Sequence, residues 1–154
     1  MIPYQWEALN DRIEDAEPSG CIRNFRVASK QEEGEFYGMV FQDSDVYKWL
    51  EAVAYSLMWH PDEELEKTAD DVIDLIGAAQ QPDGYLDTYY IINGLEKRFT
   101  NLMDHHELYC LGHMVEGAVA YYNATGKRKF LDIAIGYADC CLLYTSPSPR
   151  DYAA

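Results

Sequence analysis

Residues 45–61 read DVYKWLEAVAYSLMWHP, and this stretch decides the fold. Its apolar residues recur at intervals of three and four, which places them on one stripe of an α-helix: Val46, Trp49, Leu50, Val53, Ala54, Leu57 and Met58. Asp45 or Ser44 can supply the oxygen that caps the start. The helix must end near His60, because the residue before Pro61 disfavours the α conformation.

Further helical patterns follow this one at regular intervals. A helix starting at Pro61 carries a stripe of Leu65, Ala69, Val72, Ile73 and Ile76. A third is predicted at about 105–123, with Leu108, Leu111, Val115, Val119 and Tyr122 in its stripe and Gly126 as its stop. A fourth covers 130–138. The two helix pairs share their spacing and form a faint repeat of αα-hairpins, as in α-solenoids and αα-barrels. The sequence therefore predicts an all-α fold.

The remaining segments have weaker patterns. Residues 2–13 predict a short amphipathic helix that the turn at 18–20 ends. Residues 21–38 read as a loop. Residues 89–103 also read as a loop, with a short strand at 89–92.

Composition limits the classes of partner. The 154 residues carry a net charge of −15, which repels phosphate backbones and anionic membranes, so we expect neither nucleic acid nor a membrane as partner. The four cysteines show no disulfide framework, and the start has no signal-peptide pattern. Reduced thiols and a cytoplasmic location are the expectation.

The last residues break the helical pattern. Residues 141–151 (CLLYTSPSPRD) run from an amphipathic helix into alternating serine and proline without a cap. The string resembles a translated adaptor of the kind used in sequencing libraries. A native Ser/Pro linker is the alternative. We therefore expect residues 1–140 to be the native part and 141–154 to be a non-native tail.

The densest cluster of chemically versatile side chains is HHELYCLGH at residues 105–113. On a helix, His106, Cys110 and His113 share a face, and all are metal-ligand types. That face also carries core positions, so Cys110 reads more simply as a small buried residue. We expect no metal here, and we expect His106 to hydrogen-bond a ligand.

The loop at residues 80–87 (QQPDGYLD) combines amides, carboxylates and an aromatic ring. A sugar site needs such groups for its hydroxyls and for its apolar face. Gln81, Asp83 and Tyr85 are therefore candidate substrate-binding residues, and Asp43 is another. The alternatives are a Pro-Asp-Gly turn for the loop and, for Asp45, which could bind a sugar in the same way as Asp43, a helix cap.

Three motifs in order resemble glycoside hydrolase family 127, the β-L-arabinofuranosidases. They are residues 39–51 (MVFQDSDVYKWLE), residues 79–88 (AQQPDGYLDT) and HELY at 106–109 with Gly112 and His113; residues 2–6 (IPYQW) match near the family's start. The resemblance implies a catalytic domain that is an (α/α)6 barrel of stacked hairpins. Residues 1–140 would then be its incomplete, N-terminal part.

The resemblance also implies a function. Family members are retaining glycosidases that release terminal β-L-arabinofuranose, with a cysteine nucleophile near a Zn²⁺ held by Glu and Cys and with a Glu as acid/base. Those residues lie beyond this chain, so we assign no catalytic residue here, and Cys140 and Cys141 are not given the role. His106 matches a family histidine that contacts the sugar. The chain alone is expected to be inactive and to bind no zinc.

Two other functions stay open at this point. One is a non-catalytic αα-repeat module that binds a sugar or a peptide on its concave face. The other is a small metalloprotein that uses His106, Cys110 and His113. If the barrel is partial, its missing C-terminal part is itself a partner, and stripes such as Trp49, Val53 and Leu57 would be exposed and would promote aggregation.

Overall fold

The structure is a computed structural model that describes residues 1–145. The elements are α1 (Ile2–Leu9), α2 (Cys21–Ala28), α3 (Asp43–Trp59), α4 (Glu63–Ala79), α5 (Thr88–Asn93), a 3₁₀ turn (Leu95–Lys97), α6 (Glu107–Thr125) and α7 (Lys129–Thr145). No strand occurs in this part of the chain. Nor does any helix in it have the length and apolar character needed to span a bilayer.

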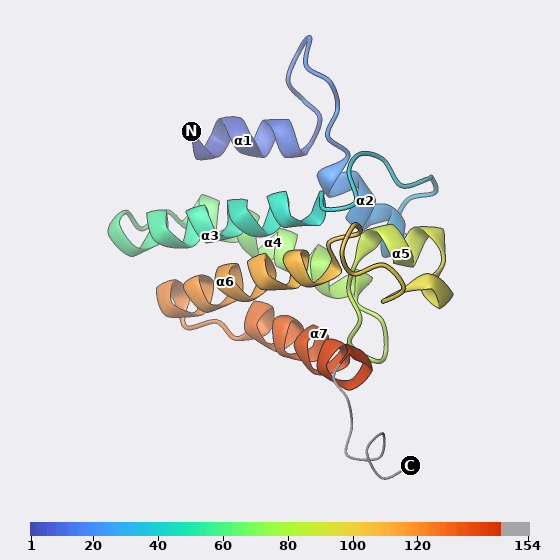
Figure 1. Ribbon diagram of the computed structural model, residues 1–154. Helices are drawn as coiled ribbons and strands as arrows, with labels where there is room; N and C mark the ends of the chain where they lie inside the picture. The colour runs from blue at the N-terminus through green and yellow to red at the C-terminus, as the bar shows by residue number, and fades with distance from the viewer. Residues whose placement is uncertain (146–154) are drawn as a thin grey trace.

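Two helical hairpins, α3–α4 and α6–α7, form the body of the molecule (Figure 1). Asp62 caps α4 by accepting a 3.0 Å hydrogen bond from the Leu65 amide, so the helix begins at Glu63, two residues later than the sequence predicted. Gly126 ends α6 in the left-handed conformation, at φ 73°. The predicted hairpins are therefore present at nearly the predicted bounds.

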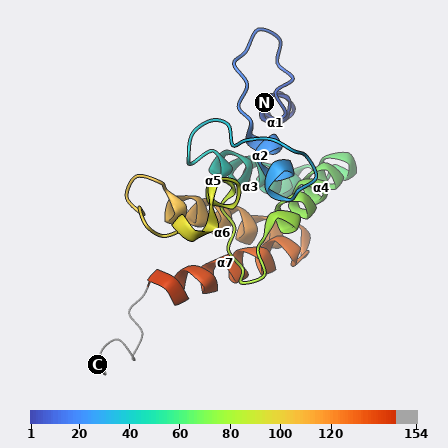
Figure 2. The same ribbon diagram turned by 90° about the vertical axis from the view of Figure 1, so that its right-hand side faces the viewer.

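Helices α3 and α6 lie side by side and form one layer; α4, which lies behind α3, and α7, which runs below α6, contact each other and form the second (Figures 1 and 2). Both α3 and α6 begin at the end of the bundle where α2 and α5 lie. We call this end the head of the bundle, defined by the first turns of α3 and α6. Loops 81–87 and 98–106 also reach it, so segments far apart in sequence meet there.

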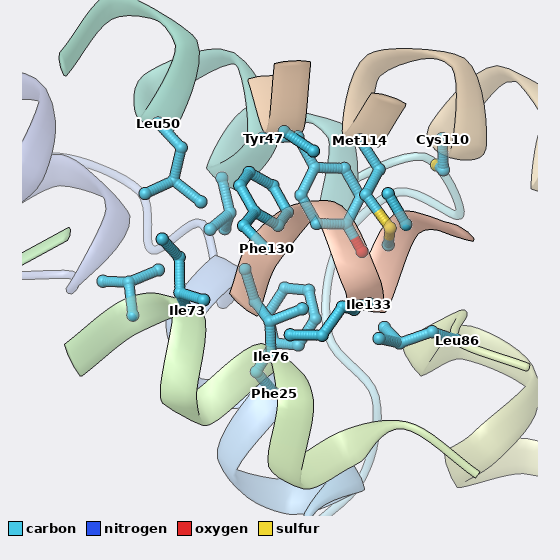
Figure 3. Packing of buried hydrophobic residues seen from close by; sticks show 14 of the residues in the cluster. Phe25, Tyr47, Leu50, Ile73, Ile76, Leu86, Cys110, Met114, Phe130 and Ile133 are labelled. Carbon is cyan, nitrogen blue, oxygen red and sulfur yellow. The ribbon is translucent and has the colours of Figure 1, made fainter. Parts of the chain in front are cut away.

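The hydrophobic core fills the space between the two layers (Figure 3). Tyr47 is at its centre, with its ring 6.1 Å from that of Phe25 and 6.2 Å from that of Phe130. Met114, Ile76 and Ile133 complete the surroundings. Because each of the four long helices and α2 contributes fully buried side chains, all five are part of one core.

Three weak segments differ from their sequence predictions. Residues 21–28 are helical instead of a loop, because Cys21, Ile22 and Phe25 form a buried stripe that was too short to recognise. Residues 88–93 are helical instead of containing a strand, despite their β-favouring composition, since tertiary contacts override propensity in short segments. The first helix ends at Leu9, where the chain turns through Asp11 at φ 59°.

The exposed apolar surface is not the one that the sequence suggested. Trp49, Val53 and Leu57 are at most 8% exposed, so the prediction that they face solvent is wrong. Instead, α6 presents much of its own predicted stripe outward; Leu108, Val115, Val119 and Tyr122 are 37–44% exposed. This helix is apolar nearly all round, and its opposite face, with Cys110, Met114 and Tyr121, is the one in the core.

Gly84 should be irreplaceable for steric reasons. A Cβ there would lie 2.2 Å from the carbonyl oxygen of Gly136, and its φ of 93° is a conformation that other residues rarely adopt. We expect Gly84→Ala to lower the free energy of unfolding by about 2 kcal/mol or more.

Gly112 supplies the matched control, because a Cβ on this helical residue meets nothing within 4 Å. Gly112→Ala should raise stability by about 0.5–1 kcal/mol through helix propensity. Urea denaturation of both variants measures the difference. Similar effects of the two substitutions would contradict this account of the 84–136 contact.

Candidate functional site

Polar and aromatic side chains gather at the head of the bundle. We call this group the head cluster; it comprises Phe41, Asp45, Lys48, His106, Tyr109 and His113. The ring centroids of Phe41 and His106 are 5.3 Å apart, and those of Tyr109 and His113 are 4.6 Å apart. Tyr109 is 43% exposed, so the cluster is open to solvent. Aromatic faces beside hydroxyl-binding groups are what carbohydrate recognition requires.

His106 has an unusual backbone. It precedes the first residue of α6 with φ 59° and ψ 26°, the left-handed region that a non-glycine residue seldom occupies. Its ring Nδ1 lies 2.7 Å from the carbonyl oxygen of Asp104. A carbonyl oxygen only accepts hydrogen bonds, so Nδ1 carries the proton. In the neutral ring, Nε2 is therefore left as an acceptor. Such local strain is frequent at functional sites.

Lys48 supplies the positive charge of the cluster. Its Nζ donates to the Tyr109 hydroxyl at 3.0 Å and lies 3.6 Å from an oxygen of Asp45. Burial lowers the pKa of Lys48, but the hydrogen bond with Tyr109 and the charge of Asp45 outweigh it and leave the pKa raised. The ammonium group therefore stays charged, and it is half-exposed and able to donate to a sugar hydroxyl.

Gln81 and Asp83 lie elsewhere. With Pro82, Leu95, Glu96 and Arg98 they line a surface hollow of about 440 Å³ that no residue of the head cluster lines. Asp83 pairs with Arg98 at 2.8 Å and accepts a 3.1 Å hydrogen bond from the Tyr85 amide. Gln81 donates to the Ala79 carbonyl oxygen at 2.9 Å. Both side chains thus have turn-stabilising contacts, and their role in substrate binding stays a prediction.

Asp43 and Tyr85 are inside the protein. Tyr85 is fully buried and donates from its hydroxyl to Glu107 at 2.6 Å. Asp43 is 2% exposed and accepts hydrogen bonds from the amide and hydroxyl of Thr88, at 2.8 and 2.5 Å. Burial raises the pKa of Asp43 to about 6, although the bonds with Thr88 oppose the rise. Both side chains are buried under the head of the bundle. In the described structure, neither is accessible to a ligand.

The described residues contain no group of three or more His, Cys, Asp and Glu side chains arranged to hold a metal ion. Cys110 is 1% exposed, and burial raises the pKa of its thiol, which opposes thiolate formation. Burial also raises the pKa of Cys141 to about 12. The side chains present therefore do not fit a zinc site of the kind that the family resemblance implies, whether at residues 106–113 or at 140–141.

The architecture and the sequence both match known proteins. The family described as the β-L-arabinofuranosidase, GH127 catalytic domain matches residues 2–152. The chain belongs to glycoside hydrolase family 127. This confirms the resemblance that the three motifs indicated.

Individual relatives agree with the family match. The non-reducing end β-L-arabinofuranosidase of Bifidobacterium longum is 46% identical over 91% of this chain and 24% of its own length. The crystal structure of a family 127 β-L-arabinofuranosidase from Geobacillus stearothermophilus superimposes with a TM-score of 0.94, at 66% identity, over 96% of this chain and 23% of the other. A further family 127 β-arabinofuranosidase gives a TM-score of 0.84, at 39% identity, over 96% of this chain and 24% of its own.

The chain spans about a quarter of the length of these relatives. Its helices superimpose on family members almost throughout, so the predicted all-α class and partial helical barrel are confirmed. The comparisons do not test the predicted boundary at residue 140. Residues 141–145 continue α7, with Leu143 76% exposed, and residues 146–154 lie outside the described part.

Sequence reasoning missed half of the head cluster. Phe41, Lys48 and Tyr109 were not singled out, although all lie within the motifs that carried the resemblance. Lys48 and Tyr109 are 61 residues apart, and only the pairing of α3 with α6 brings them within 3.0 Å. The signal available in the sequence was Lys48, a charged residue within the apolar pattern of its helix. That signal does not show that Tyr109 is its hydrogen-bond partner.

The geometry at His106 predicts the tautomer of its ring. In the neutral ring, ¹⁵N NMR should show the proton on Nδ1, because the Asp104 carbonyl oxygen fixes it there. The exposed His60 provides an internal reference in the same spectrum. A predominant Nε2–H form at His106 would contradict the assignment.

Proposed function

We propose that residues 1–140 form the N-terminal part of the barrel of a retaining glycosidase that releases terminal β-L-arabinofuranose, and that this part is inactive alone. The head cluster is the observation that carries the proposal: it places rings, a lysine and an acceptor histidine at one end of the bundle in a chain of this family. The Bifidobacterium relative is named for the same activity.

Each residue of the head cluster has a defined role in this proposal. The Nε2 atom of His106 accepts a hydrogen bond from a sugar hydroxyl, because Nδ1 is already committed to Asp104. Lys48 donates to a second hydroxyl and Asp45 accepts from it, since both are half-exposed. The rings of Phe41 and Tyr109 offer apolar faces to the sugar C–H groups.

The remaining chemistry belongs to other parts of the barrel. The family resemblance places the nucleophilic cysteine, the acid/base glutamate and the zinc ligands outside residues 1–140. Retaining hydrolysis needs a nucleophile that forms a glycosyl intermediate and an acid/base that then activates water. Because the described residues do not fit zinc, no step is assigned to the metal here, and the chain's contribution is to bind and orient the sugar.

The partner of this chain is the rest of its own barrel. The exposed apolar residues of α6 share one side of the helix at intervals of seven, four and three residues, which is the pattern that a neighbouring helix buries. A following hairpin would cover them as α6 covers α3. The net charge of −15 argues against nucleic acid and anionic membranes as partners, and the buried cysteine thiols are consistent with a cytoplasmic enzyme.

A chimera tests the proposed activity. The chain alone should release no arabinose from an aryl β-L-arabinofuranoside, whereas residues 1–140 joined to the remaining three quarters of the Geobacillus enzyme should. In the chimera, His106→Ala should lower kcat/KM about tenfold, as expected for the loss of one hydrogen bond. His60→Ala serves as the control and should have no effect. A folded chimera that releases a different sugar, or none, would refute the proposal.

Self-association tests the open side of α6. Val119→Lys should lower the average mass of the isolated chain about twofold in light scattering, because a charge interrupts the apolar surface. Ala78→Lys adds the same charge at an exposed position of α4 and should leave the mass unchanged. Equal effects of both variants would show that net charge, and not the α6 surface, controls association.

A further inference from the structure

Three carboxyl groups are buried beneath the head of the bundle. Asp43 begins α3, Asp87 precedes α5 and Glu107 begins α6, and their exposed fractions are 2%, 1% and 0%. Among the described residues, no ion pair includes any of them. A charge removed from water without a partner is strongly unfavourable, so three ionised groups in this space would destabilise the fold.

Hydrogen-bond donors are distributed unequally among the three. Glu107 accepts from the Tyr85 hydroxyl at 2.6 Å and from the Phe99 amide at 3.0 Å. Asp43 accepts from the amide and the hydroxyl of Thr88. Neither carboxyl oxygen of Asp87 receives a hydrogen bond of normal geometry, although both are buried. Asp87 is therefore the group whose ionised form the structure supports least.

Asp43 and Asp87 lie next to each other. The amide that Asp43 binds at 2.8 Å belongs to the peptide bond between Asp87 and Thr88. The Asp43 carboxylate therefore rests against the backbone of Asp87 at the start of α5. Burial is the largest cause that raises the pKa of Asp87, followed by the charges of Asp43 and Glu107. The nearby amides of Tyr90 and Tyr89 oppose this rise without overcoming it.

We propose that Asp87 is a neutral carboxylic acid in the folded chain and donates its proton to the carboxylate of Asp43, so that one shared proton joins the start of α3 to the start of α5. The donor is the O–H of Asp87, and the acceptor is a lone pair that Thr88 leaves free on Asp43. We call this pair the proton clasp. It does not depend on the glycosidase proposal.

The groups that face the clasp bring no compensating charge to it. Tyr47 of α3 and Tyr137 of α7 have buried hydroxyls, and burial raises both pKa values, so they stay neutral. The thiol of Cys110 in α6 and the hydroxyl of Tyr85 also have raised pKa values through burial. Arg98 and His105 act on Glu107, where their charges lower its pKa against the effect of burial.

The raised pKa values of the two buried aspartates make stability depend on pH in one direction. Both aspartates have raised pKa values in the folded state, so each binds its proton more tightly there than in the unfolded chain, where the value is about 3.9. The contribution is complete below about pH 4. For Asp43 it is lost as the pH rises through about 6, and for Asp87 as the pH rises through its own raised pKa.

Equilibrium urea denaturation of Asp87→Asn between pH 4 and 8 tests the clasp. Asparagine retains the shape and donates a hydrogen bond without titrating. The ratio of the wild-type unfolding constant to that of the variant should rise by up to about tenfold per pH unit through the window. The control is Asp139→Asn, a change at an exposed position of α7 that should run parallel to the wild type. Parallel curves for Asp87→Asn and wild type would overturn the proposal.

Infrared spectroscopy tests the protonated acid without unfolding the chain. At pH 7 the wild type and Asp139→Asn should show the carbonyl stretch of a protonated carboxyl group, and Asp87→Asn should lack it. A wild-type spectrum without this band at pH 7 overturns the proposal whether or not the variant folds.

Discussion

A side chain at position 117 would place its Cβ 2.9 Å from the carbonyl oxygen of Tyr47, so the close packing of α3 against α6 requires glycine there. This contact sets the relative height of the two helices. Both helices begin at the same end of the bundle (Figure 1), and their contact brings Lys48 to Tyr109. The head cluster therefore depends on a close approach of two backbones at Tyr47, the residue before Lys48, and Gly117, one turn beyond His113.

The sequence was sufficient for the long helices and their pairing. Stripes such as that from Val46 to Leu57 repeat often enough for the period to be clear, and the stops at Pro61 and Gly126 have local causes. The short helices α2 and α5 could not be predicted from the sequence, because they contain too few residues to show a helical period of apolar side chains. Contacts with distant segments stabilise their helical conformation. For α6 the period was recognised but the buried side was not, because apolar residues occupy both sides.

The candidate site was predicted only in part, for a related reason. His106 was identified because its residue type and motif are distinctive. Asp43 and Tyr85 were also selected by type, yet the structure surrounds both with partners and gives them supporting roles. A single sequence shows which side chains can bind a sugar, but whether a carboxylate faces solvent or Thr88 depends on how loops 81–87 and 98–106 fold over the helix starts.

The apolar side of α6 has a consequence for how such a barrel is made. The two hairpins already enclose a core of aromatic and aliphatic side chains. The second hairpin, α6–α7, leaves the apolar side of α6 exposed to solvent. A structure of this kind can fold one hairpin at a time, because each hairpin packs against the folded hairpin before it and exposes an apolar surface for the hairpin after it. On a ribosome, where the earliest residues emerge first, the barrel can be assembled in the order in which it is translated. The same open edge that is predicted to make the isolated chain self-associate is then a template for vectorial folding.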